Sequence, residues 1–81
     1  MEGTNKMIQT ADLLLYLFSR NLIRLRKKKG LTQTQAAIAL DIPNRTYARF
    51  EQSYRLPKAQ KLARFCNFFE CEVAEFFKKI L

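Results

Sequence analysis

The sequence predicts an all-α fold of five short helices, and three observations lead to this prediction. Apolar residues recur at spacings of three and four along most of the chain, which is the period of an amphipathic helix. No segment shows the strict alternation of a half-buried strand. With 81 residues, 48% of them hydrophobic, the chain has room for one domain with a single core that draws on seven Phe and three Tyr.

The first helix is predicted over about residues 10–30, so the chain divides into a mobile tail at 1–9 and a single domain at 10–81. Asp12 favours a helix start, and Gly30 ends the helical pattern. The beginning of this helix forms an N-terminal helical extension of the domain. Its apolar face comprises Leu14, Leu17, Phe18, Leu22 and Leu25.

Two short helices joined by about three residues come next. Thr32 and Gln35 have the spacing of a capping box, which predicts a second helix to about Leu40. Pro43 opens a third helix that ends near Gln52, because a proline at the first helical position sacrifices no hydrogen bond. A fourth helix follows Pro57 and a fifth begins at about residue 72. Their predicted apolar positions are Leu62, Phe65, Cys66 and Phe69 in the fourth helix, and Val73, Phe76, Phe77 and Ile80 in the fifth.

Charge is concentrated in the middle of the chain. The whole sequence has 15 basic and seven acidic residues, a net charge of +8. Between Arg20 and Arg64 there are twelve basic residues and two acidic ones. Such a segment attracts the phosphates of nucleic acid or of an anionic membrane. A basic surface that only maintains solubility is the alternative interpretation.

The composition argues against catalysis and against a metal centre. Cys66 and Cys71 cannot supply the four ligands of a structural zinc site, and the chain has no His, so we expect no metal and no cofactor. There is no glycine-rich phosphate loop and no nucleophile near an evident base, so we expect no catalytic residues and no enzyme activity.

Residues 32–52 have the spacing of a helix-turn-helix. Two short helices with so brief a connection cross steeply, which requires small side chains at the crossing and bulky apolar ones around it. The residues assigned to this core are Ala36, Ala37, Leu40, Ile42, Tyr47 and Phe50. The outer face of the helix at 43–52 carries Asn44, Arg45, Ala48 and Arg49. Asn pairs with adenine and Arg with guanine, so these residue types can read bases in the major groove of DNA.

The runs LRKKKGLTQTQAAIALDIPNRTYARFEQ and RLPKAQKLARFCNFFE resemble the phage-repressor, Cro and XRE-like helix-turn-helix family. The resemblance covers about residues 22–77 and implies a five-helix lambda-repressor-like domain that binds double-stranded DNA through a recognition helix at 43–52. It places the base-reading positions at Asn44, Arg45, Ala48 and Arg49. It also implies that Gln33 binds a phosphate and braces the recognition helix, and that Arg26 and Glu51 form a structural ion pair.

The resemblance also implies that Thr46 and the loop with Arg55 lie near the DNA backbone. The other expected phosphate contacts are Thr32, Lys27, Lys28, Lys58 and Lys61. The chain also departs from the family pattern: Asp41, Ser53 and Glu70 stand where glycines are common, and Pro43 replaces the usual Ser or Thr cap. We expect these changes to affect docking geometry more than the fold.

The function expected from these features is that of a transcriptional regulator, interpreted as a repressor, which binds a palindromic operator as a homodimer. The last helix is assigned the dimer contact, through Phe77, Ile80 and Leu81, and the N-terminal extension with Leu13, Tyr16 and Leu17 is the alternative. An antitoxin or other protein-interaction module, with a toxin or RNA polymerase as partner, is the alternative function. The apolar run at 13–18 is too short to span a bilayer, so we expect a cytoplasmic protein of a prokaryote or phage, associated with the nucleoid when bound to DNA.

Overall fold

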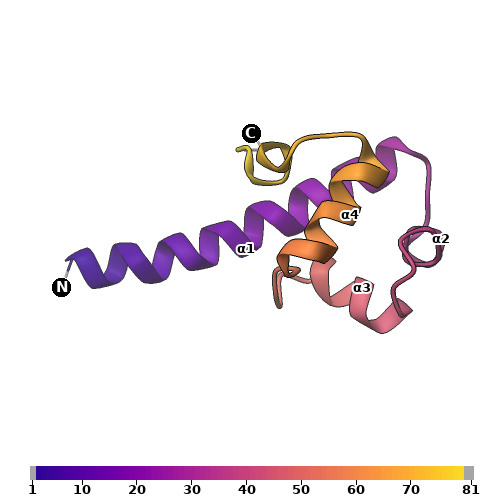
Figure 1. Cartoon of the computed structure of the whole chain (residues 1–81). Helices are drawn as coiled ribbons and strands as arrows, with labels where there is room; N and C mark the ends of the chain where they lie inside the picture. The colour runs from indigo at the N-terminus through magenta and orange to yellow at the C-terminus, as the bar shows by residue number, and fades with distance from the viewer. Residues whose placement is uncertain (1, 80–81) are drawn as a thin grey trace.

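The computed structural model describes the backbone of residues 2–79 and the side chains from residue 10 onward. Within these residues all regular secondary structure is helical, as predicted (Figure 1). The elements are α1 (Glu2–Lys28), α2 (Gln33–Ala39), α3 (Asn44–Glu51), α4 (Ala59–Phe69) and the 3₁₀ helix η1 (Val73–Phe77). No helix among the described residues is long and apolar enough to cross a membrane.

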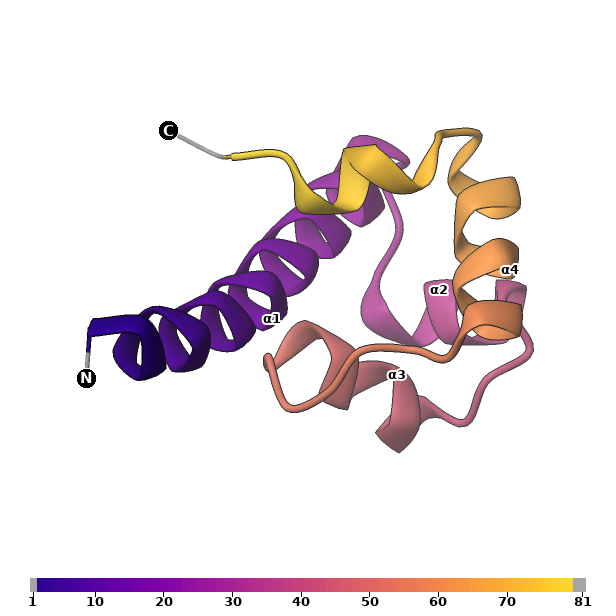
Figure 2. The same cartoon turned by 60° about the vertical axis from the view of Figure 1, so that its left-hand side comes forward.

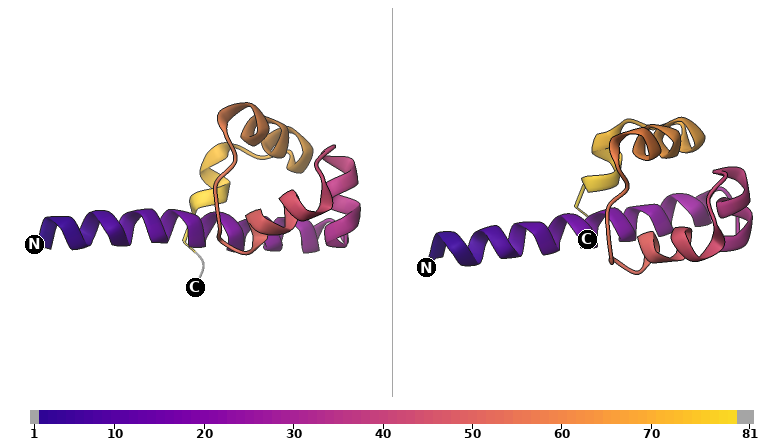
Figure 3. Two further views of the ribbon diagram at one scale, coloured as in Figure 1. Left: turned by 90° about the horizontal axis from the view of Figure 1, so that it is seen from below. Right: turned by 60° about the horizontal axis from the view of Figure 1, so that its bottom comes forward.

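α1 is longer than predicted. It begins at Glu2, whereas the sequence predicts a start near residue 10 after a mobile tail at 1–9. Residues 2–9 hold apolar residues only at positions 7 and 8, which are too few to show a helical period in the sequence. The N-terminal half of α1 projects from the rest of the molecule, as Figures 1 and 3 show. The long extent of the molecule is 43 Å, compared with 24 and 21 Å in the other two directions.

The second half of α1 forms one wall of the core. α3 and η1 both pack against it, and α2 packs on α3 (Figure 2). Phe18 on α1 is fully buried, and its ring stacks on that of Phe76 with centroids 5.0 Å apart. Phe65 on α4 meets Phe50 edge-on at 5.6 Å. Such large aromatic side chains supply much of the apolar area that a core of this size buries.

All four α-helices end with the same backbone arrangement, a residue with positive φ followed by a hydrogen bond back to the last turn. At the end of α1 this residue is Gly30, with φ 75°. At the ends of α2, α3 and α4 it is Asp41, Ser53 and Glu70, with φ of 57°, 65° and 55°. The next amide donates to a carbonyl five residues back in every case, for example Ile42 N to Ala37 O at 2.9 Å. The three residues that replace family glycines thus take the left-handed conformation that glycine adopts most easily.

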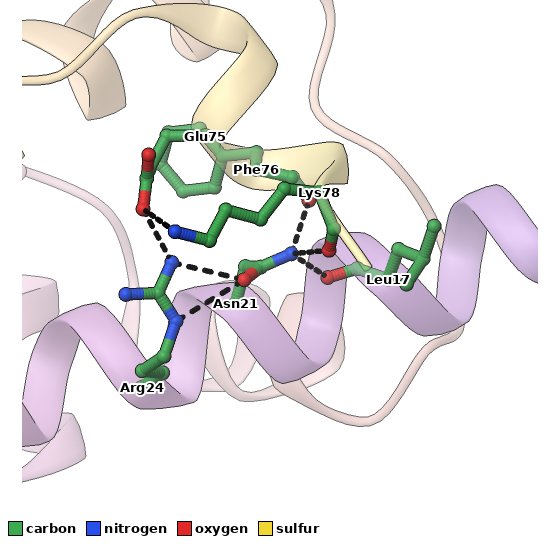
Figure 4. A network of polar contacts seen from close by, with 6 residues as sticks. All are labelled: Leu17, Asn21, Arg24, Glu75, Phe76 and Lys78. Atoms are coloured by element: carbon green, nitrogen blue, oxygen red, sulfur yellow. Dashed lines mark hydrogen bonds and ion pairs between the residues drawn. The ribbon is translucent and has the colours of Figure 1, made fainter. Parts of the chain in front are cut away.

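The last element differs from its prediction, because it is a 3₁₀ helix and not an α-helix. Phe76 is buried in the core, but Val73, predicted on the apolar face, is 48% exposed. The helix stops early because the buried Asn21 side chain of α1 takes two of the carbonyls at its end, those of Phe76 and Lys78 (Figure 4). Of the predicted dimer residues, Phe77 is half-buried with its ring 5.9 Å from Phe18, while Ile80 and Leu81 lie outside the described residues.

Candidate DNA interface

α3 has one buried and one exposed face. Tyr47, Phe50 and Glu51 are buried, while Asn44, Arg45 and Arg49 are exposed to solvent. Among the described residues, neither Arg45 nor Arg49 forms an ion pair. Two unpaired guanidinium groups four residues apart repel each other unless a polyanion lies against them. The exposed face of α3 is therefore suited to bind an anionic partner.

The N-terminal ends of α2 and α3 lie next to each other. The Asn44 side-chain amide of α3 donates to Thr34 Oγ1 of α2 at 3.2 Å. At the start of α2, Thr32 and Gln35 form the predicted capping box. At the start of α3, Pro43 provides no side-chain cap, so the first N–H groups of this helix keep no side-chain acceptor. Free N–H groups at the positive end of the helix dipole can bind a phosphate.

A buried carboxylate connects the recognition helix to the two helices before it. The Glu51 side chain is 2% exposed and accepts from Arg26 Nε of α1 at 2.7 Å, so the expected ion pair is present. It also accepts from Gln33 Nε2 of α2 at 2.8 Å and from the Tyr47 hydroxyl at 2.6 Å. Arg26 Nη1 donates in addition to the carbonyl of Leu31 in the loop before α2. Glu51 thereby fixes the angle between α2 and α3, which decides how their exposed ends meet a ligand.

The same network shifts two ionisation equilibria. The hydrogen bond to Glu51 raises the pKa of Arg26 above its usual value, so the guanidinium stays charged. Burial raises the pKa of Tyr47 above its usual value, and the hydrogen bond to Glu51 adds to this shift. Both shifts favour a charged Arg26 guanidinium and a neutral Tyr47 hydroxyl.

Gln33 braces the recognition helix as the resemblance implies, and its phosphate contact stays a prediction. Its side chain braces α3 through Glu51, and the residue remains exposed at the start of α2. An amide has two N–H donors and a carbonyl, so one N–H is still available to a phosphate after the bond to Glu51.

A basic hollow of about 510 Å³ lies beside the C-terminal end of α3. Its wall includes Arg55, Lys58, Lys61 and Arg64. The Arg55 guanidinium lies 5.5 Å from the centre of the Phe50 ring and the Lys61 ammonium 5.8 Å from it, distances typical of cation–π contacts. The structure thus brings together three of the predicted phosphate contacts and adds Arg64, which the sequence analysis did not select.

The other predicted contact residues differ in their exposure to solvent. Lys27 and Lys28 are exposed in the last turn of α1, and Thr32 is exposed at the start of α2. Thr46 and Ala48 are only half-exposed on α3. The analysis also missed Thr34, whose contact with Asn44 had no signal in the sequence because it depends on how α2 and α3 cross.

A steeply crossed helix pair, its exposed second helix rich in Asn and Arg, and a neighbouring basic hollow define the chain as a DNA-binding helix-turn-helix protein. The sequence profile of a helix-turn-helix family matches residues 22–76, more than half of the chain. The chain belongs to this family, the XRE-like helix-turn-helix proteins, which are DNA-binding transcriptional regulators. No curated protein and no solved structure matches the chain.

Proposed function

We propose that the chain is a transcriptional repressor that binds a palindromic operator as a dimer, with α3 in the major groove. The observation that carries the proposal is the exposure of Asn44, Arg45 and Arg49 on a helix whose other face is locked by Glu51. A helix that reads bases must be held rigidly while its reading side chains remain exposed to solvent, and α3 meets both conditions.

The proposed contacts divide into two sets. Asn44, Arg45 and Arg49 read base edges, and Ala48 lies close enough to the bases to exclude a bulky group. Phosphates are held by Gln33 and the start of α2 on one side of α3, and by the basic hollow with Arg55, Lys58 and Lys61 on the other. Contacts on both sides of the reading helix fix its register along the groove.

Repression requires only that the operator be occupied, which a DNA-binding domain does by itself. One such domain reads few base pairs, so specificity comes from two copies on half-sites about one helical turn apart. An antitoxin that also binds a toxin is a second candidate function, and the exposed apolar side chains Leu13, Leu14 and Tyr16 favour a protein partner of some kind.

The test is a selection of bound duplexes from a random pool at about 150 mM salt, since phosphate contacts alone give affinity that depends steeply on salt. We expect a two-fold symmetric consensus. Binding without a consensus, lost as the salt concentration rises, would contradict sequence-specific regulation.

A substitution distinguishes reading residues from phosphate contacts. Arg45→Ala should weaken binding to the selected site by about 1–3 kcal/mol and relax the preference at one base pair, because a bidentate contact to a base is lost. Lys58→Ala is the control and should weaken all sequences equally, because phosphate carries no sequence information. Affinities for the selected site and a scrambled duplex are compared by titration. Equal losses on both duplexes for Arg45→Ala would remove this residue from the reading set.

A further inference from the structure

The projecting half of α1 has large apolar side chains that are exposed to solvent. Leu13, Leu14 and Tyr16 are 46%, 39% and 52% exposed, although they belong to the same helix as the fully buried Phe18 and Leu22. This segment precedes residue 22, where the family match begins. The DNA-binding domain of the family therefore does not require it, and its apolar side chains need another explanation.

The exposed segment continues the repeat that the core uses. The buried face of α1 includes Phe18, Leu22 and Leu25, and stepping back by three and four residues reaches Leu15, Leu14 and Ala11. In the sequence, positions 7 and 8 are also apolar and extend the same repeat by one further turn. A stripe with spacings of three and four packs against another helix with the same stripe, as in a coiled coil.

Charge indicates which partner carries that helix. Residues 1–19 have a net charge of −1, while residues 20–81 have a net charge of +9. Two copies of residues 20–81 therefore repel each other. The projecting half of α1 lies within the nearly neutral residues 1–19, so two copies of it can approach without this repulsion. The DNA-binding end of α3 stays clear, because the hydrogen bond of 2.6 Å between Ser19 and Ser53 brings the opposite, C-terminal end of α3 beside α1 where the projection begins.

The length also suits a second copy on DNA. Residues 2–16 of α1 form a rod of about 22 Å at 1.5 Å per residue. Two such rods packed side by side and antiparallel separate the two domains by this length, and α3 lies close to the base of each rod. The rods, together with the distance of each α3 from its own rod, must then span the 34–36 Å between successive major grooves on one side of DNA.

We propose that the projecting half of α1 pairs with the same segment of a second copy and that this helix pair forms the dimer. The proposal rests on the proposed function for the role of the dimer on DNA, and it replaces the C-terminal residues as the site of the contact. Phe77 packs against Phe18 within its own chain, which leaves little of it for a partner.

The experiment measures the dimer dissociation constant of the full chain by sedimentation equilibrium without DNA. Leu14→Glu should weaken the dimer about 100-fold, because a two-fold contact carries the substitution twice, and Leu14→Ala should weaken it about 10-fold. Val73→Glu is the matched control, since it places the same charge at an aliphatic residue of 48% exposure outside α1. A chain lacking residues 80–81 tests the C-terminal alternative. Both controls should dimerise like the wild type, and circular dichroism checks that every variant is folded.

The proposal is overturned if the wild type sediments as a monomer, or if both Leu14 variants keep the wild-type dissociation constant. It is also overturned if the dimer is lost only when residues 80–81 are removed. Measurements of DNA binding distinguish a failure of the dimer proposal from a failure of the proposed function. A monomeric Leu14→Glu chain should still prefer a single half-site duplex over a scrambled one and lose only the extra affinity for the palindrome. A wild type that dimerises through α1 but shows no sequence preference would support the dimer and contradict the repressor.

Discussion

Two carboxylates, those of Glu51 and Glu75, each form an ion pair with an arginine of α1. The two networks around them differ in which group is buried. Around Glu51 the charged groups themselves are buried, with side chains of Glu51 and Arg26 2% and 12% exposed. Around Glu75 the ion pair with Arg24 is 2.7 Å long but lies near the surface, with side chains 31% and 34% exposed. The group that is fully buried there is the neutral amide of Asn21 (Figure 4). Arg24 and Arg26 are two residues apart on α1 and so point to nearly opposite sides of it.

The difference indicates what each network does. The Glu51 network holds α2 and α3, the helices proposed to bind DNA, at a fixed angle to α1 and to each other. The network around Asn21 and Glu75 holds the end of η1, which closes the core behind Phe76. A buried charge pair is costly to break, whereas an exposed one contributes little. Substitutions in the two networks should therefore have very different effects.

The largest effect is expected for Glu51→Gln. The substitution keeps the shape of the side chain but leaves the buried Arg26 guanidinium without its carboxylate, and this should lower the free energy of unfolding by about 3 kcal/mol. Urea denaturation measures the change. Glu72→Gln is the control, because Glu72 is exposed and forms no ion pair with a described residue. If the two substitutions had equal effects, burial would not be what distinguishes Glu51.

Asn21→Ala should have a smaller effect and lower the free energy of unfolding by about 2 kcal/mol, because two carbonyls at the end of η1 lose their donor. The Asn21 amide donates to the carbonyls of Phe76 and Lys78 at 3.0 and 2.9 Å. Hydrogen exchange should become faster for the amides of η1 but not for those of α2 and α3. Asn67→Ala, at an exposed position of α4, is the control. Equal acceleration of exchange in α3 would mean that the two networks are coupled and do not act separately.

The features predicted from the sequence are those set by local spacing or by the family pattern. The six residues assigned to the helix-turn-helix core are all buried, because small and bulky side chains alternate over a short connection there. The Thr32 capping box needs only residues three apart. The Arg26 to Glu51 pair was implied by the resemblance and not by the spacing of these residues. The base-reading and phosphate contacts stay predictions.

The missed features depend on residues far apart in the chain or on an absent partner. Asn21 contacts carbonyls 55 and 57 residues away, so no local pattern could reveal its role or the early end of η1. The first turns of α1 were missed because residues 2–9 hold too few apolar residues to show a helical period. The left-handed conformations of Ser53 and Glu70 had an indirect signal, since each stands where glycine is common in the family that the sequence resembles.

The smallest effect is expected for Glu75→Gln, and its pH dependence tests whether the exposed pair acts through charge. The hydrogen bond from Arg24 lowers the pKa of Glu75 in the folded chain. The pair therefore stabilises the fold above the pKa of the unfolded carboxyl, about 4.3, and this contribution is lost as the pH falls through the lower folded-state value. The difference in melting temperature between wild type and Glu75→Gln should be small at pH 7, smaller still in high salt, and absent at about pH 3. A difference that persisted at low pH would show that Glu75 acts through shape and packing and not through its charge. The contrast with Glu51 could then not be explained by the burial of one charge and the exposure of the other.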